Sequence, residues 1–340
     1  MRLLQGLLLL ALSLATVAVA APDRETSETG FSLLHAAVEA PRHVSFIGQV
    51  QLLELGAHGS EASIFRVEHL APNLFERRYL APENLYGDST IFSGNAVYSI
   101  DPKRKQIVVT PHEVYGLHFG WTHNFALLTR NYRPVKEPDE IVAGRPVDVI
   151  RLVNRYSGVT TLRIWIDEKT SLMLRRDVYA SNGSVVLQMH FDKVRFTNAI
   201  PRSAFALPHG YTIVKGPSEE EASDNPAAVV ARAGFASRAP HYLPEGFVAV
   251  GAELGDERGV RILHVLYSDG LRTVSLFENA RGAAVNTTGY HAVKLSVGGR
   301  EMDAVDEGAT TMLAWSDDRL HYALVGDLGR TELEKIAASI

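Results

Sequence analysis

The sequence contains no cysteine. Disulfide bonds and thiolate metal sites are therefore excluded. Lipidation at a bacterial lipoprotein signal site is excluded as well, because it requires a cysteine. A chain without such cross-links is held together by burial of apolar surface. The residues are 46% hydrophobic, and about 320 residues beyond the leader described below are enough for two domain cores.

Positive charge is scarce as well. The 34 Lys and Arg residues are outnumbered by 39 Asp and Glu residues, which gives a formal net charge of -5 and a pI near 6.2. Nucleic-acid binding needs a basic face. The composition therefore excludes a nucleic-acid partner.

Long apolar runs are confined to the N-terminus. Arg2 precedes an apolar stretch over 7–20, which ends in the small residues Ala18-Val19-Ala20 before Ala21-Pro22. This pattern is typical of a secretory signal peptide. We predict cleavage near Ala20 and a mature chain in the bacterial periplasm. A retained membrane anchor is the alternative, since 3–20 approaches spanning length, but the small residues favour cleavage.

Catalytic and cofactor motifs are also missing. There is no Gly-x-Ser-x-Gly elbow, and Gly298-Gly299 lacks the helix and lysine of a phosphate-binding loop. His112, His118 and His123 share one aromatic segment, but spacings of six and five residues suit neither one helix face nor one strand face. We predict no metal site, no cofactor and no enzyme activity, with an exported hydrolase as the disfavoured alternative.

Acidic pairs and runs occur where solvated residues or turns are expected. Glu219, Glu220 and Glu221 lie in a polar stretch, and Asp167-Glu168 and Asp317-Asp318 separate apolar runs. Short polar side chains of this kind favour turns. We interpret them as turn or surface residues.

Hydrophobic periodicity predicts one helix followed by a long antiparallel meander. Phe31, Leu34 and Val38 recur at helical spacing before Pro41. Alternation with period two then predicts strands over 45–53, 63–69, 75–80, 89–92, 96–100, 106–110, 146–153, 160–166, 172–179 and 185–194. The aromatic segment over 115–131 lacks this alternation, so we expect a helical or irregular crossing there.

The composition changes after residue 214. A stretch over 215–240 is rich in Gly, Pro, Glu and Ala, which predicts a linker whose Ala-rich part is a short helix. A smaller unit follows, with strands expected over 260–267, 271–277, 310–315 and 320–325 and a helix over 331–340. The predicted organisation is a signal peptide (1–20), a first domain (28–214), a linker (215–240) and a second domain (241–340). The predicted fold class is α+β with mostly antiparallel strands.

The alternating strands place large apolar residues on one face of the first domain. These candidates for an apolar ligand cleft are Phe46, Val50, Phe65, Val67, Phe75, Tyr79, Leu162, Ile164, Leu172, Leu174, Leu187, Met189 and Phe191. A half-open barrel would leave this face accessible to a ligand, whereas a closed one would fill it with side chains. Burial in an ordinary core is the alternative, and alternation by itself leaves both open.

A partner surface is expected on the second domain. The Ser268-Asp269-Gly270 hairpin and the last sheet edge could receive a strand from another protein. Asp269 and Gly270 could equally serve only to form the turn. Arg261, Arg272 and Arg281 are candidates for pairing with acidic partner residues, although exposed arginines commonly contribute little.

The order of these elements resembles a known family. The stretches "GRPVDVIRLVNRYSGVTTLRIWIDEKTSLMLRRDVYASNGSVVLQMHFDKV" and "FALPHGYTI" resemble the half-barrel of LolA/LolB-type proteins, and in particular the N-terminal domain of the RseB/MucB family. The stretches "YLPEGF", "HVLYSDGLRTVSLFE" and "YALVGDLGRTELEKIAASI" are similar to the C-terminal domain of that family. The resemblance covers nearly the whole mature chain and carries no catalytic motif.

The resemblance implies a LolA/LolB-like half-barrel with a helix plug, followed by a small antiparallel sheet with a C-terminal helix. It implies a regulator that binds the periplasmic region of a membrane-bound anti-sigma factor and restrains envelope-stress sigma-factor activation. A lipid or acylated ligand in the apolar cleft would weaken that binding. The alternative is a periplasmic lipoprotein carrier of the LolA type. Self-association into a homo-oligomer is left open.

Overall fold

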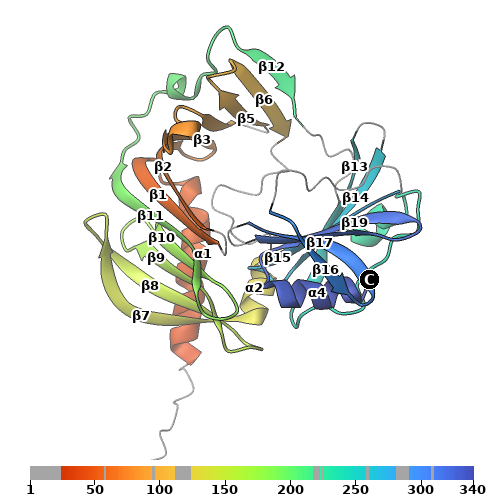
Figure 1. Cartoon of the computed structure of the whole chain (residues 1–340). Helices are drawn as coiled ribbons and strands as arrows, with labels where there is room; N and C mark the ends of the chain where they lie inside the picture. Colours follow the sequence, from red (N-terminus) through yellow and green to blue (C-terminus); the bar gives the residue numbers. More distant parts are fainter. Residues whose placement is uncertain are drawn as a thin grey trace, which may run out of the picture.

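The computed structural model describes residues 24–340 except 57–58, 94–95, 112–123, 217–222, 224, 258–259, 281–290 and 308–309. The described residues form two β-sheets, and each sheet is covered by its own helices. Figure 1 shows the larger sheet in red to green and the smaller one in green to blue, with α2 lying between them. The predicted fold class, α+β with mostly antiparallel strands, is confirmed.

The first sheet has twelve strands in the order β12-β6-β5-β4-β3-β2-β1-β11-β10-β9-β8-β7. All its pairs are antiparallel except β12 with β6, which is parallel. The strands are β1 (Phe46–Gly56), β2 (Gly59–Leu70), β3 (Leu74–Ala81), β4 (Ser89–Ser93), β5 (Ala96–Asp101), β6 (Gln106–Pro111), β7 (Tyr132–Val142), β8 (Arg145–Asn154), β9 (Thr160–Asp167), β10 (Met173–Tyr179), β11 (Val185–Phe196) and β12 (Thr212–Lys215).

The helix α1 (Arg24–Glu39) covers one face of this sheet and ends in a short turn, η1 (Ala40–Arg42). Leu34 and Ala37 join the buried cluster formed by strands β1, β2, β3 and β7 to β11, and Figure 1 shows the helix running across the sheet. The apolar spacing predicted only its second half, because the residues before Phe31 are polar and carry no periodic signal.

The other face of β3 to β6 is covered by the segment that follows β11. Ile200, just before the short turn η4 (Arg202–Phe205), and Phe205 within that turn pack on Leu74, Ile91 and Ile107. The first sheet is thus covered on different faces at its two ends. This arrangement leaves β7 and β12 as its edges.

All ten strand ranges predicted between 45 and 194 are confirmed to within a few residues at their ends. Two strands were missed. β7 contains Pro134 and Pro138, which the alternation rules penalise, but an edge strand tolerates proline because one side of its backbone needs no ladder partner. β12 has only four residues, too few for a periodic signal.

Past the range 112–123, which lies outside the described residues, the chain forms the helix α2 (Phe125–Asn131). Its first turn is capped by the Asn124 side chain, which accepts a hydrogen bond from the Leu127 amide at 2.9 Å. The expected helical crossing is confirmed for this part. The three histidines His112, His118 and His123 lie outside the described residues.

The second sheet has the order β13-β14-β15-β19-β18-β17-β16, and all its pairs are antiparallel. The helices α3 (Pro226–Val230) and α4 (Arg330–Ala338) bury apolar residues in the core on one of its faces. The strands are β13 (Val248–Glu257), β14 (Val260–Ser268), β15 (Thr273–Ala280), β16 (Val293–Val297), β17 (Arg300–Glu307), β18 (Thr310–Ser316) and β19 (Leu320–Gly326).

The four strands and the terminal helix predicted for this unit are confirmed, as is the short helix in the Ala-rich stretch. β13, β16 and β17 were missed. β13 contains Gly251 and Gly255, and β16 and β17 are joined by Gly298-Gly299 and carry several charges, so none shows a clear apolar alternation. The boundaries 28–214, 215–240 and 241–340 stay a prediction.

Candidate functional site at the domain interface

The tip of the β14–β15 hairpin, residues 268–272, enters the first domain. Gly270 has φ +97° and lies so close to α2 that a Cβ atom there would stand 2.3 Å from the backbone nitrogen of Leu128. Only glycine combines that backbone conformation with such an approach. Leu271 next to it packs against the core of the first domain. The hairpin therefore joins the two domains.

Buried polar groups complete this contact. The Asn131 side-chain amide donates hydrogen bonds to the carbonyls of Gly246 (2.9 Å) and Asp269 (2.8 Å). The Tyr132 hydroxyl donates to Asp269 Oδ2 at 2.5 Å. Asn131 and Tyr132 are fully buried, and Asp269 is 1% exposed. Since buried polar groups are costly without partners, these bonds specify one docked arrangement.

Electrostatics at the contact follow from this burial. Desolvation and the neighbouring Asp269 carboxylate raise the pKa of the Tyr132 hydroxyl, so it stays protonated and donates its hydrogen bond. Asp269 Oδ1 also accepts the backbone amides of Leu271 and Arg272, at 2.9 and 2.8 Å. The turn is thus shaped by the same carboxylate that binds the other domain.

A second acid lies behind the hairpin. Asp327 follows β19, and its carboxylate accepts the Thr273 amide at 2.9 Å. Burial raises the pKa of Asp327 to about 6, although the Thr273 hydrogen bond and the nearby Arg272 lower it. This carboxylate holds the first residue of β15 next to the end of β19.

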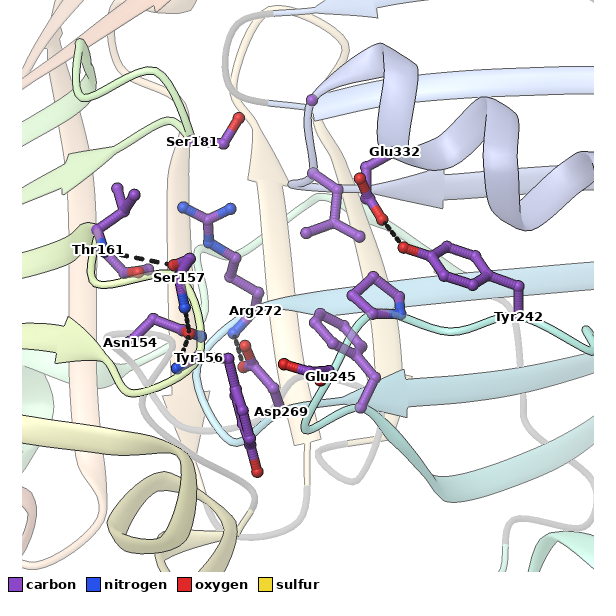
Figure 2. Close-up of a pocket in the computed structure, with 15 residues that line it drawn as sticks. Asn154, Tyr156, Ser157, Thr161, Ser181, Tyr242, Glu245, Asp269, Arg272 and Glu332 are labelled. Carbon is purple, nitrogen blue, oxygen red and sulfur yellow. Dashed lines mark hydrogen bonds between the residues drawn. The ribbon is translucent and has the colours of Figure 1, made fainter.

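A cleft opens beside the hairpin, between the two domains, with a volume of about 430 Å³. The first domain contributes the β8–β9 loop and Ser181, and the second contributes the 242–247 segment, the hairpin and the start of α4 (Figure 2). The lining residues are Asn154, Tyr156, Ser157, Val159, Thr161, Ser181, Tyr242, Pro244, Glu245, Phe247, Asp269, Arg272, Leu328, Gly329 and Glu332. A space of this size can hold a small ligand or a few residues of peptide.

The second-domain wall of the cleft carries a tyrosine that is hydrogen-bonded to a carboxylate. The Tyr242 hydroxyl donates to Glu332 Oε1, and Figure 2 shows this pair at the second-domain side of the cleft. The hydrogen bond to Glu332 raises the pKa of Tyr242 to about 12, with smaller contributions from burial and from Glu245. The wall is therefore polar and acidic.

The three predicted partner arginines are not brought together. Arg272 lies at the domain interface, where its Nη2 donates to the Tyr179 carbonyl of the first domain at 3.0 Å. Arg261 donates to the Arg232 carbonyl at 3.2 Å within the second domain. Arg281 lies outside the described residues. Pairing of these arginines with an acidic partner stays a prediction, and Arg272 already serves an internal contact.

The thirteen apolar candidates do come together. Eleven of them are buried in one cluster with Leu34 and Ala37 of α1, and Tyr79 and Leu187 are half-buried at its border. Phe191 also borders a second cavity, of about 420 Å³, near Ile141 and His190. In this arrangement α1 occupies the apolar face. Whether that face admits a ligand stays a prediction, which now requires movement of α1.

The interpretation of Asp167 and Asp317 as turn residues is confirmed, whereas Glu219, Glu220 and Glu221 lie outside the described residues. Asp167 Oδ1 accepts the Thr170 amide at 2.9 Å, and Asp317 Oδ1 accepts the Arg319 and Leu320 amides, each at 2.8 Å. Asp167 does more than shape its turn, because Arg145 Nε donates to its other oxygen at 2.5 Å. Its charge is therefore paired.

Within the part of the chain that the structure describes, no three His, Asp or Glu side chains are grouped to hold a metal ion. No described helix is both long and apolar enough to cross a membrane. The interface residues Asn131 and Tyr132 were missed because they lie at the end of the 115–131 segment and directly after it, where no periodicity was found. No local pattern marks these two residues, because their burial at the interface depends on how the two domains pack.

Both halves of the chain match known domain families. Residues 57–208 match the MucB/RseB N-terminal domain, and residues 237–340 match a domain of unknown function, DUF4367. The Sigma-E factor regulatory protein RseB of Haemophilus influenzae is 30% identical over 167 residues. That alignment covers 47% of this chain and 48% of the relative, so the chain spans about half the length of the curated relative it matches.

Solved structures extend the similarity to both domains. MucB in complex with MucA(peri) has a TM-score of 0.61 at 16% identity, covering 91% of this chain and 97% of that one. The Pseudomonas aeruginosa MucA/MucB complex gives 0.61 at 15% identity, covering 92% and 98%. MucB alone gives 0.56 at 16% identity, again over 92% and 98%. These matches show the same two-domain fold as MucB, and the family model identifies residues 57–208 as a MucB/RseB N-terminal domain.

Proposed function

We propose that this chain is a periplasmic regulator that binds the periplasmic region of a membrane-bound anti-sigma factor. Binding would restrain the release of an envelope-stress sigma factor. The chain would act by binding and not as an enzyme. The observation that carries the proposal is the family match in the first domain, joined to a fold that follows MucB in its complex with MucA(peri) across both domains.

The domain interface supports a role in regulation. The hairpin tip contacts α2 through Gly270, and α2 contributes Leu128 to the same core that α1 fills. A change in the first-domain core that moved α2 would therefore reach the hairpin directly. Coupling of this kind needs an element with two arrangements that both sites influence.

We further propose that an acyl chain of a lipid or lipoprotein enters the apolar face of the first domain. Phe46, Val50 and Ile164 on that face are fully buried and belong to the same cluster as Leu34 and Ala37 of α1. An acyl chain would have to displace α1 and replace its apolar contacts. Because α2 borders the same core, such displacement would loosen the hairpin contact and weaken partner binding.

Partner binding is tested with the mature chain and the purified periplasmic region of the anti-sigma factor of the same organism. We expect a stable complex, measured by isothermal titration calorimetry, with a Kd of about 1 μM or tighter. Absence of any heat and of any co-elution would overturn the regulator proposal. Loss of the chain in cells should raise stress transcription, whereas loss of a lipoprotein carrier would leave lipoproteins in the inner membrane.

The lipid proposal has its own test. A spin label on α1 and another on β11 would report their separation in the presence of a short-chain diacyl lipid. We expect the distance to increase and the affinity for the anti-sigma region to fall with the same lipid concentration dependence. An unchanged distance at saturating lipid would contradict the proposed entry route.

A further inference from the structure

The two walls of the interdomain cleft differ in charge. Its charged lining residues are Glu245, Asp269, Arg272 and Glu332, all from the second domain. The first-domain wall is neutral and offers the hydroxyls and amide of Asn154, Ser157, Thr161 and Ser181 among others. The charge that a ligand meets is therefore set by one wall.

Asp269 and Arg272 carry opposite charges, and both side chains are already engaged in contacts within the chain. Asp269 holds the hairpin turn and accepts the Tyr132 hydroxyl, and the backbone amide of Arg272 donates to the same carboxylate. The Arg272 guanidinium is held at the interface by the Tyr179 carbonyl. This neighbouring acid and base leave little net charge for a ligand.

The other two charges are both negative. Glu332 accepts the Tyr242 hydroxyl, and Lys335 contacts its second oxygen at 3.2 Å. Glu245 is exposed, and its carboxylate makes no hydrogen bond or ion pair with the described part of the chain. Figure 2 shows the Glu245 carboxylate pointing into the space between the domains. This wall therefore presents one free carboxylate and one partly neutralised one.

Exposed aromatic rings flank these carboxylates. Tyr242 on the second domain is 38% exposed and Tyr156 on the first is 49% exposed, and Phe247 and Pro244 line the cleft between the charged groups. Aromatic faces attract Lys and Arg side chains and also pack against their methylene stems. Carboxylates beside aromatic rings make a site that suits a cation on an aliphatic chain.

We propose that this cleft binds a lysine or arginine side chain of an extended peptide. Glu245 pairs with the cationic head, and Tyr156, Tyr242 and Phe247 cover its stem. The first-domain hydroxyls are placed to bond the peptide backbone. The anti-sigma region supplies the peptide and its basic residue, and in this respect the inference rests on the proposed function. The charge preference is opposite to the acidic partner that the arginines suggested from the sequence.

The test compares the mature chain with Glu245→Gln and with Glu168→Gln as a matched control. Glu168 is also an exposed glutamate, but it lies in the β9–β10 turn of the first domain and does not line the cleft. Each protein is titrated with the anti-sigma periplasmic region and with two synthetic peptides, Gly-Lys-Leu-Lys-Gly and Gly-Glu-Leu-Glu-Gly, both capped at their ends. Thermal unfolding midpoints check that the variants are folded.

We expect the basic peptide and the anti-sigma region to bind about fivefold to tenfold more weakly to Glu245→Gln at low ionic strength, and equally well to the control. The difference should shrink as salt is added. Equal binding of the acidic and basic peptides, or no effect of Glu245→Gln on the basic peptide, would overturn the cleft assignment.

The two proposals fail in different ways. If the basic peptide binds through Glu245 but the anti-sigma region does not bind at all, the regulator proposal is wrong and the cleft assignment stands. If the anti-sigma region binds the wild-type chain and Glu245→Gln equally, the regulator proposal stands and the cleft assignment is wrong.

Discussion

Both domains pack a helix on one face of their sheet. They differ in the pKa shift of particular carboxylates, which is downward for Asp167 in the first domain and upward for Glu278 and Asp327 in the second. In the first domain, burial raises the pKa of Asp167, but hydrogen bonds from Arg145 and Thr170 outweigh it and hold the pKa below its usual range. In the second, burial raises the pKa of Glu278 and of Asp327, whose hydrogen bonds come from a hydroxyl and backbone amides and not from a guanidinium. Asp167 should therefore contribute to the pH dependence of stability with the opposite sign to Glu278 and Asp327, whereas Asp317 in the second domain has a lowered pKa like Asp167.

The signs follow from proton linkage. Asp167 contributes stability that is present above its unfolded pKa and is lost as the pH falls through its lowered folded value. Asp327 contributes stability that is complete below its unfolded pKa and is lost as the pH rises through its folded value of about 6. Mild acid thus favours the second domain and the hairpin base, while stronger acid weakens the first domain. Four substitutions test the contact between the domains and these two carboxylates, in order of expected effect.

The largest effect is expected where the domains meet. Gly270→Ala places a methyl group against the α2 backbone, so the hairpin has to leave its site or α2 has to move. We expect a loss of about 3 kcal/mol in the free energy of unfolding, from overpacking added to the strain of a positive φ. Urea unfolding measures the loss, and small-angle scattering should show a larger radius of gyration.

The matched control for that change is Gly183→Ala. Gly183 also has a positive φ, of 84°, in the β10–β11 turn, but no atom lies within 4 Å of a Cβ built there. It should lose only the strain, about 1 kcal/mol. Equal losses for the two variants would mean that the hairpin contact contributes nothing beyond backbone conformation.

The next effect is expected in the first domain. Asp167→Asn removes the charge that accepts two guanidinium hydrogen bonds from Arg145, and we expect a loss of about 2 kcal/mol at neutral pH. The loss of stability on acidification should also become smaller. The exposed pair of Asp139 with Lys136 supplies the control, because Asp139→Asn should cost less than about 1 kcal/mol. Chemical unfolding over a series of pH values tests both statements.

A smaller effect is expected for the polar bond across the interface. Tyr132→Phe removes the hydroxyl that donates to Asp269 and leaves a buried carboxylate oxygen without that partner, so we expect a loss of about 1.5 kcal/mol. Tyr156→Phe is the control: its hydroxyl donates to Asn131 at 3.2 Å from a half-exposed ring. If both variants lower the free energy of unfolding by the same amount, the buried hydrogen bond from Tyr132 to Asp269 contributes no more to docking than the exposed one.

The smallest effect, and the one of opposite sign, is expected for Asp327→Asn. The amide oxygen can still accept the Thr273 amide but carries no charge, so the variant should be about 1 kcal/mol more stable than wild type at pH 8 and no more stable near pH 4. Asp318→Asn, which removes the carboxylate of an exposed turn, is the matched control and should not show the gain in stability expected for Asp327→Asn at pH 8. A wild-type stability that does not fall between pH 5 and pH 7 relative to Asp327→Asn would refute the linkage.

Local patterns were enough for most of the fold. Strands with one buried and one polar face, such as β1 and β11, were predicted because their alternation is the direct result of a half-buried sheet. The turn at Ser268-Asp269-Gly270 was predicted because the positive φ of its glycine is a local requirement. Edge strands such as β7 and β16 escaped prediction, because an edge tolerates proline and charge that would disrupt a central strand.

The candidate site was less predictable. The apolar residues of the first domain were identified as one face, but alternation could not show that α1 fills it. Arg272 was identified as a partner residue, yet its hydrogen bond goes to Tyr179, 93 positions earlier in the chain. Contacts over such separations depend on how whole domains pack and leave no periodic trace in the sequence.

The sequence by itself determined the chemistry available to this protein: no thiol, no catalytic motif, an acidic net charge, two units rich in alternating strands and an Asp-Gly turn. Each of these depends on residue type or on spacing within a few residues. The tertiary structure alone decided that the Asp-Gly turn is buried in the other domain and that Glu245 faces a cleft beside two exposed tyrosines. These outcomes required the close fit of surfaces from distant parts of the chain, since burial and electrostatic environment are properties of the packed molecule.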